Sequence, residues 1–452
     1  MADSGAYAQA RTLHRQGRLA EAAALYRDVL TRQPQHADAL HYLGLAVATL
    51  GDEPQALRLL EAAVRLQPAN AALHANLASV LSQAGRHAEA VGSYDRALAL
   101  QPGLTAAHRG RGTALMQLGE VERALASFRD AVRVAPADHQ AHNGLGVALE
   151  RAGRTEEARG SFARAIALEP RNAEAHHNLG ILESAAGRHT EALASLERAL
   201  ALQPDQPALH GNRGTVLLAL GRPTEALASF ERALALAPQD ARAHHNRGLA
   251  LVSLARVGEA LPSFERALAL DPAAAVTHLW RGKACLELGR PEEALASIDR
   301  ARELAPGEFS AHLERGVALT RLKHHEEALR SFDAALAADA RSHEAANNRG
   351  AVLVRLFRPA DALADFAHAT ALKPDYVEPH TNSGIALRGL GRYDEALASL
   401  DRALALRPGD PTATWCKALV KLGLGELREG WPLYEARQHL EPARRMARSF
   451  TM

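Results

Sequence analysis

Small and bulky apolar residues recur along the chain in a pattern with a period of 34 residues. Alanine occupies one position of each period from Ala22 to Ala396, and a bulky apolar residue follows four positions later, from Tyr26 to Tyr434. Residues four apart lie on one face of a helix, so each period predicts a helix with an apolar face. A glycine column that starts at Gly44 predicts a close crossing with a second helix.

Prolines and a second glycine column mark the ends of these helices. From Pro34 to Pro442 the column prolines stand 34 residues apart or a multiple of 34, and proline ends a helix because it cannot continue the hydrogen-bond ladder. The second glycine column, which starts at Gly17 and ends at Gly425, marks the turn between the two helices, where a left-handed backbone costs little without a Cβ. Each period therefore predicts a helix-turn-helix unit.

A few units lack these proline and glycine residues. The turn glycine becomes Ala255, Lys323 and Phe357, and the closing proline becomes Ala340. A left-handed residue other than glycine costs roughly 1–2 kcal/mol, so we expect those turns to adopt another conformation. Pro262 also removes a backbone donor early in a second helix. The stretch 255–357 is thus expected to be the least regular and most flexible part of the array.

Taken together, the columns resemble the tetratricopeptide repeat, with units at 3–36, 37–70 and onward to 411–444. The resemblance implies an all-α fold, a right-handed α-solenoid superhelix of about 13 helix-turn-helix units. Stacked units bury a continuous core and leave one concave and one convex face. We assign residues 3–444 to the array and 445–452 to a C-terminal tail, which we interpret as a truncated junction to a missing domain.

The sixth position of the first helix carries the candidate site. In this family the first helix lines the concave face, and its sixth residue is asparagine in six units: Asn76, Asn178, Asn212, Asn246, Asn348 and Asn382. A carboxamide offers a donor and an acceptor together, which matches a peptide bond. The column resembles the asparagine ladder in the repeat arm of O-linked N-acetylglucosamine transferases, which implies binding of an extended peptide. Alternatively, these side chains are solvated or satisfied within the array. Other residues interrupt the column: Tyr42, Gly110, Gly144, Trp280, Glu314 and Cys416.

Arginine follows the asparagine position in several units, where the family more often has leucine: Arg111, Arg213, Arg247, Arg281, Arg315 and Arg349. We name Arg213 and Arg247 as candidate peptide-binding residues, because cations beside the amides favour acidic ligand segments. The alternative is that these arginines pair with carboxylates of neighbouring helices.

The remaining chemistry argues against catalysis. Nine of the 22 histidines occupy the fourth position of a unit, from His74 to His380. Adjacent units set them roughly 10 Å apart, too far for a shared metal ion, so we expect packing or solvated histidines. The chain has no nucleophile elbow, phosphate-binding loop, Cys-x-x-Cys or zinc-protease motif. We expect no catalytic residue, no metal and no cofactor.

Charge and cysteine content narrow the partners and the location. The formal net charge is +1, from 53 basic and 52 acidic residues, which gives no drive towards nucleic acid or anionic membranes. There is no apolar run long enough to span a membrane and no signal peptide. The cysteines are Cys285 and Cys416 alone, which suits a reducing compartment. We expect a cytoplasmic protein whose partners are proteins or extended peptides.

The last unit favours a second function. Its segment 429–437, which contains Trp431, Pro432 and Tyr434, resembles the junction at which bacterial repeat arrays enter a glycosyltransferase-like domain. Three hypotheses follow: a stand-alone scaffold that binds proteins through its concave groove, the substrate-recruiting arm of a protein glycosyltransferase whose catalytic domain is absent, and an array that self-associates through its terminal repeats.

Overall fold

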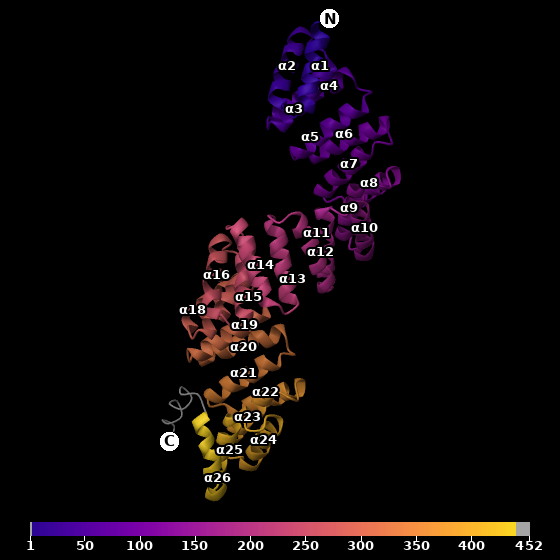
Figure 1. Cartoon of the computed structure of the whole chain (residues 1–452). Coiled ribbons are helices and arrows are strands. Elements are labelled where there is room, and N and C mark those ends of the chain that lie inside the picture. Colours follow the sequence, from indigo (N-terminus) through magenta and orange to yellow (C-terminus); the bar gives the residue numbers. More distant parts are fainter. Residues whose placement is uncertain (1, 440–452) are drawn as a thin grey trace. The chain divides into compact units, whose positions relative to one another are not determined.

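A computed structural model describes residues 2–439, and this part of the chain consists of helices and short turns: 26 α-helices followed by one 3-10 helix (Figure 1). The expected all-α solenoid of helix-turn-helix units is confirmed. The tail assigned to 445–452 lies outside the described residues. The chain divides into two compact units, Met1–Arg222 (unit 1) and Pro223–Met452 (unit 2), and each is described by itself.

Unit 1 contains thirteen helices. They are α1 (Ala2–Arg15), α2 (Leu19–Arg32), α3 (Ala37–Thr49), α4 (Glu53–Leu66), α5 (Ala71–Gln83), α6 (His87–Leu100), α7 (Thr105–Gln117), α8 (Val121–Val134), α9 (His139–Arg151), α10 (Thr155–Leu168), α11 (Ala173–Ala185), α12 (His189–Leu202) and α13 (Pro207–Ala219).

Unit 2 contains the others. They are α14 (Pro223–Leu236), α15 (Ala241–Ser253), α16 (Val257–Leu270), α17 (Ala275–Glu287), α18 (Pro291–Leu304), α19 (Phe309–Arg321), α20 (His325–Ala338), α21 (His343–Arg355), α22 (Pro359–Leu372), α23 (Val377–Gly389), α24 (Tyr393–Leu406), α25 (Pro411–Gly423), α26 (Leu427–Tyr434) and the 3-10 helix η1 (Glu435–His439).

Odd-numbered helices are the first helices of the repeats and even-numbered helices are the second. Several first helices begin at a side-chain cap: Oδ1 of Asp138 accepts the backbone N–H groups of Gln140 and Ala141 at 2.9 and 3.1 Å. Such a cap satisfies donors that have no partner within the helix. The turn that follows a first helix contains a glycine with positive φ, for example Gly153 at 73°. These local signals place the helix ends where the sequence predicts them.

The turns without glycine keep the same backbone, so the expected change of conformation is wrong. Ala255, Lys323 and Phe357 hold φ angles of 56°, 65° and 59°. The reason is a pair of hydrogen bonds: the N–H of Ala255 donates to Val252 and that of Arg256 to Leu251, at 2.9 Å each. The glycine turn at Gly153 has the same two bonds. The helix-ending hydrogen bonds therefore fix the turn, and the strain remains in these three residues.

The other departures also leave the helices in place. Helix α20 ends at Ala338 although Ala340 replaces the closing proline, and the N–H of Asp339 still donates to Ala335 at 2.8 Å. Helix α16 continues through Pro262, which lies in its first half. The expected flexibility of 255–357 stays a prediction, since the elements there have the same bounds within each repeat as elsewhere.

The core of most repeats depends on the contact between a glycine and a bulky side chain sixteen residues later; Ala10, Ala78 and Ala418 replace the glycine in the others. A methyl group at Gly146 would lie 2.5 Å from Cε1 of Phe162, and Phe162 is fully buried. The glycines at 112, 248, 316 and 350 meet a phenylalanine in the same way. First helices of neighbouring repeats also contact one another, such as α7 with α9 and α17 with α19. The glycines thus let the two helices of one repeat approach closely, and the contacts between first helices form a continuous layer within each unit.

Candidate functional site

The surface formed by the first helices, which we call the first-helix face, carries the asparagine column. All six asparagines are half-buried, and four of them donate a hydrogen bond from Nδ2 to the residue 35 positions earlier, on the preceding first helix. The bonds are Asn76 to Nε2 of His41 (2.7 Å), Asn178 to Oδ1 of Asn143 (3.1 Å), Asn212 to Nε2 of His177 (2.8 Å) and Asn382 to Oδ1 of Asn347 (2.9 Å).

The two remaining asparagines lie in the same layer. Oδ1 of Asn348 accepts from Nδ2 of Asn347 at 3.5 Å, and Asn347 also faces the hydroxyl of Tyr376. Asn246 is half-buried on α15. The assignment of the column to peptide binding stays a prediction, and the contacts within the array show how the carboxamides are oriented.

Sequence reasoning missed the acceptors of these bonds, which precede the asparagine position in the unit before. His41, Asn143, His177 and Asn347 differ in type, yet each offers an acceptor at the same place. Burial lowers the pKa of His41 to about 4 and lowers the pKa of His177 as well. Both imidazoles are therefore neutral near pH 7 and can accept a hydrogen bond. The sequence does contain a signal for these acceptors. Each is a polar residue at the fifth position of its unit, directly before the asparagine position.

The interruptions of the column have separate causes. A side chain at Gly144 would collide with the ring of Phe128, at 2.8 Å from its Cδ1. At Tyr42 the guanidinium of Arg11 lies 4.1 Å from the ring centroid, a cation–π contact. Trp280 and Glu314 line a pocket of about 300 Å³ between α15, α17 and α19. The first-helix face is thus not uniform along the chain.

The arginine column contacts the second helices. All six guanidinium groups contact a carboxylate sixteen residues earlier, on the second helix of the preceding repeat, at 2.7–3.5 Å. The pairs are Arg111–Asp95, Arg213–Glu197, Arg247–Glu231, Arg281–Glu265, Arg315–Asp299 and Arg349–Asp333. These contacts support the alternative interpretation, in which the arginines pair with carboxylates of neighbouring helices.

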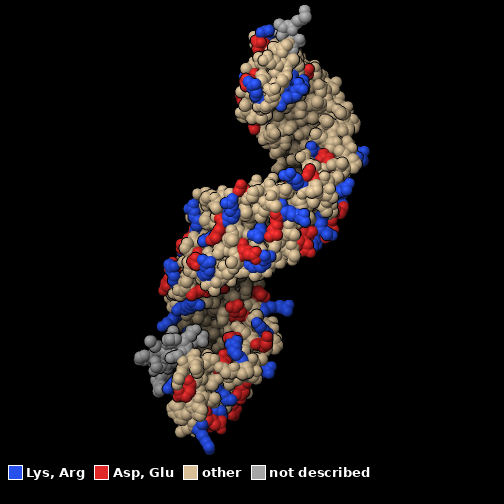
Figure 2. All heavy atoms as spheres, in the orientation of Figure 1, with Lys and Arg blue, Asp and Glu red and all other residues tan. Residues whose placement is uncertain are grey.

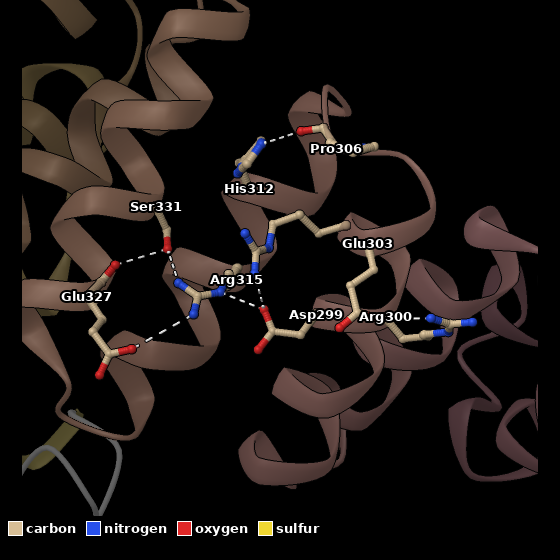
Figure 3. Close-up of polar contacts among 9 residues, drawn as sticks. Asp299, Arg300, Glu303, Pro306, His312, Arg315, Glu327 and Ser331 are labelled. Carbon is tan, nitrogen blue, oxygen red and sulfur yellow. Dashed lines mark hydrogen bonds and ion pairs between the residues drawn. The ribbon is translucent and has the colours of Figure 1, made fainter.

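Figure 3 shows one of these arginines in detail. Nε of Arg315 donates to Asp299 of α18 at 2.7 Å, and Nη1 donates to the hydroxyl of Ser331 on α20 at 2.8 Å. Arg247 likewise donates to Ser263 at 2.6 Å, and Arg213 donates to Glu197 at 3.2 Å. The two arginines named as candidates are therefore engaged with second-helix side chains, and a role for them in peptide binding stays a prediction.

Histidines at the fourth position join successive repeats through the main chain. In eight units Nε2 lies 2.7–3.1 Å from the carbonyl oxygen of the proline six residues earlier, which closes the preceding repeat. The pairs run from His74–Pro68 to His312–Pro306. The expectation of packing histidines is confirmed at these positions. Within residues 2–439 no three His, Cys, Asp or Glu side chains are placed to hold a metal ion.

Charged residues of both signs are mixed on the part of the surface that Figure 2 shows. Figure 2 shows Lys and Arg interspersed with Asp and Glu on the visible face of each unit. Many pairs are local, such as Arg154 with Glu157 at 2.6 Å, and exposed pairs of this kind contribute little stability. None of the helices in the described part is long and apolar enough to cross a membrane.

The sequence profile described as tetratricopeptide repeat matches the chain repeatedly. The matches cover residues 7–57, 50–105, 109–173, 151–207, 177–241, 212–275, 245–309 and 281–343, and a second profile of the same description covers 377–410. No curated protein matches the chain.

Solved structures with the same kind of fold include three that are distant in sequence. YrrB, described as a TPR protein with an unusual peptide-binding site, is 26% identical over 41% of this chain and 95% of its own, with a TM-score of 0.37. A tetratricopeptide repeat protein from Parabacteroides merdae is 22% identical over 55% of this chain and 98% of its own, with a TM-score of 0.44. Yeast Tom70 is 18% identical over 92% and 94%, with a TM-score of 0.38.

Proposed function

The chain belongs to the tetratricopeptide repeat family, and from that premise we propose that it is a non-catalytic scaffold that binds an extended segment of another protein along the first-helix face. The observation that supports this proposal best is the pairing of asparagines across repeats. Each pair fixes the plane of a carboxamide through its nitrogen. A ligand that meets this face then finds polar groups that are already oriented.

The oxygen atoms of the paired asparagines are available to a ligand. Among the described residues, Oδ1 of Asn76, Asn178, Asn212 and Asn382 has no hydrogen-bond partner, and none of these atoms is buried. A free carboxamide oxygen accepts a backbone N–H of a peptide. The second hydrogen on Nδ2 remains as a donor to a peptide carbonyl. This chemistry recognises the main chain of a ligand and depends little on its side chains.

The spacing of the repeats suits an extended ligand. Packed helices lie roughly 10 Å apart, and an extended chain advances about 3.3 Å per residue. An asparagine on each first helix would then meet every third residue of the ligand. Unit 1 has consecutive asparagines at 178 and 212, and unit 2 has them at 348 and 382. A segment of about ten residues would thus span two or three asparagines.

Replacing the asparagines tests the proposal. In Asn178→Ala/Asn212→Ala/Asn246→Ala, binding of a fluorescein-labelled 14-residue peptide of Gly, Ser and Ala should weaken at least tenfold in fluorescence anisotropy. Gln117→Ala removes an exposed carboxamide at the end of α7 and should leave the affinity unchanged. The circular dichroism melting curve reports whether each variant folds. Equal affinity of the folded triple variant and the original chain would contradict the proposal.

Three further proposals concern the setting of this scaffold. Cys285 and Cys416 are both buried and are the only cysteines of the sequence, which supports a cytoplasmic location. The glycosyltransferase-arm hypothesis has its support in the resemblance of segment 429–437, and sequencing of the coding DNA beyond codon 452 checks it. Self-association through terminal repeats predicts a mass that rises with concentration in light scattering.

A further inference from the structure

The asparagine column is interrupted in unit 2 at two successive repeats, and a pocket opens at that point. Trp280 on α17 and Glu314 on α19 take the asparagine position and line a cavity of about 300 Å³. Val252 of α15 and Val317 of α19 add apolar wall. This volume is at the small end of the range for ligand pockets, about 300–1,000 Å³. The pocket therefore suits one large side chain better than a whole small molecule.

The charged groups around the pocket leave it without net charge. Nζ of Lys283 lies 3.2 Å from Oε1 of Glu314 and 5.2 Å from the centroid of the Trp280 ring. Arg321 donates to the carbonyl oxygen of Leu286, and Glu287 completes the set with a carboxylate that has no partner among the described residues. The pocket lining thus contains two cationic and two anionic side chains, so their formal charges cancel.

A charged side chain gains no net attraction from a pocket without net charge, and it would lose its hydration there. A lysine or arginine side chain would meet Lys283 at the tryptophan ring, where a cation is already in place, and Arg321 of the lining. An acidic side chain would meet Glu287 and Glu314. A neutral ring avoids both repulsions, and it gains the packing that aromatic pairs have beyond their buried area.

We propose that the cavity at Trp280, which we call the Trp280 pocket, receives one aromatic side chain of the segment that lies along the first-helix face. The inference rests on the proposed function and deepens it. The asparagines hold the main chain of the ligand, and the Trp280 pocket reads one residue of it. Glu287 and Arg321, two exposed residues of the lining, offer an acceptor and a donor to the backbone beside that residue. A single aromatic anchor fixes the register of a ligand that the asparagines alone would let slide.

A peptide series tests the inference with the full chain. The host is a fluorescein-labelled 14-residue peptide of Gly, Ser and Ala whose central residue is Ala, Phe, Lys or Glu, and the readout is anisotropy. The Phe peptide should bind roughly 10-fold or more tightly than the Ala peptide, the range expected for burying a phenyl side chain. The Lys and Glu peptides should bind no better than the Ala peptide.

Trp280→Asn is the matched variant, because it restores the residue that the column has elsewhere. It should abolish the preference for Phe and bind the Ala peptide at least as tightly as the original chain does. A preference for Phe that survives in Trp280→Asn overturns the inference, as does equal binding of the Ala and Phe peptides to the original chain. The second result would leave the scaffold proposal intact.

A single-residue probe separates the pocket from the asparagine ladder. N-acetyl-phenylalaninamide, titrated to millimolar concentration, should change the tryptophan emission of the original chain and of Asn178→Ala/Asn212→Ala/Asn246→Ala alike, with no saturable change in Trp280→Asn. If none of the peptides binds but this probe does, the scaffold proposal fails and the Trp280 pocket stands as a separate site. No saturable change in the original chain overturns the inference.

Discussion

Nε2 of His312, on α19, lies 2.9 Å from the carbonyl oxygen of Pro306, in the loop that ends the preceding repeat (Figure 3). The ring nitrogen donates to an oxygen that the helix of the preceding repeat no longer uses. Proline and histidine thus act together at the repeat boundary: the proline follows the end of the second helix, and the histidine binds the carbonyl oxygen of that proline. At the boundary where Ala340 replaces the proline, the histidine is also absent and Ala346 stands in its place.

Removal of this bond should loosen one repeat boundary. We expect His312→Ala to lower the free energy of unfolding by about 1 kcal/mol, the usual net contribution of a protein hydrogen bond. His324→Ala, in the same repeat, removes an exposed side chain and should have little effect. Urea denaturation followed by circular dichroism compares the two variants. Equal midpoints for the two variants would contradict a bracing role for the histidine.

The arginine column should stabilise the array most at Arg349. Its guanidinium donates to both oxygens of Asp365, at 2.9 and 2.5 Å, and Asp365 is buried. The hydrogen bonds with Asp365 raise the pKa of Arg349. Arg349→Ala leaves this carboxylate without a counter-charge and should cost about 3 kcal/mol or more in urea denaturation.

Two further variants isolate the cause. The double variant Arg349→Ala/Asp365→Ser should recover most of the lost stability because no buried charge remains. Serine is the residue that the preceding repeat has at the equivalent position, Ser331. Arg358→Ala breaks an exposed pair with Asp361 and should cost less than about 1 kcal/mol. A double variant as unstable as Arg349→Ala would show that lost packing, not the unpaired carboxylate, is the cause.

Two of the four glycines in the repeat 139–172 should respond to alanine in opposite directions. Gly146→Ala forces a methyl group to within 2.5 Å of the buried ring of Phe162 and should cost about 1–3 kcal/mol. Gly160, on α10, has no atom within 4 Å of its would-be Cβ. Gly160→Ala should therefore raise stability by about 0.5–1 kcal/mol through helix propensity. Thermal melting of both proteins gives the sign of each change.

Periodicity was enough to predict the helices and their ends. The glycine at 146 and the phenylalanine at 162 stand at fixed places in the period, so their contact follows from the packing of one helix on another. The turns at Ala255, Lys323 and Phe357 were mispredicted because the cost of a single residue was weighed alone. Two backbone hydrogen bonds hold each turn, and together they outweigh the strain of one side chain.

The polar contacts of the site were less predictable. The hydrogen bond to the carbonyl oxygen of Pro306 was not predicted, although the proline and the histidine stand six residues apart. The acceptors for the asparagines vary between histidine and asparagine, so they form no column of identical letters. The Trp280 pocket depends on side-chain directions across three helices, which a one-dimensional pattern does not contain.

Strain at Phe357 should be removable. Its side chain is 93% exposed and its φ is 59°, so the ring adds no burial that offsets the strain. Phe357→Gly should raise the free energy of unfolding by about 1 kcal/mol, whereas Gly391→Ala, at a turn with φ of 71°, should lower it by a similar amount.

Hydrogen exchange checks the separate expectation that the stretch 255–357 is flexible. Uniform protection across all repeats would contradict a flexible stretch at 255–357.

Acid should weaken the first repeats through His41. Burial lowers its pKa to about 4 in the folded chain, against about 6.5 in the unfolded chain. Between these values the unfolded chain binds a proton that the folded chain does not, so stability falls as the pH drops from about 6.5 towards 4. A protonated ring also loses the lone pair that accepts from Asn76.

A variant without the titrating ring should resist this loss. His41→Asn copies Asn143, which accepts the same bond from Asn178, and it should match the original chain at pH 7. At pH 4.5 it should be more stable by about 2.5 kcal/mol, the value that follows from the two pKa values. Hydrogen exchange of the segments that form α3 and α5 measures this locally, and His324→Asn controls for an exposed histidine. The prediction assigns the acid sensitivity to the lowered pKa of His41. If acid reduces the protection of His41→Asn as much as that of the original chain, another group is responsible.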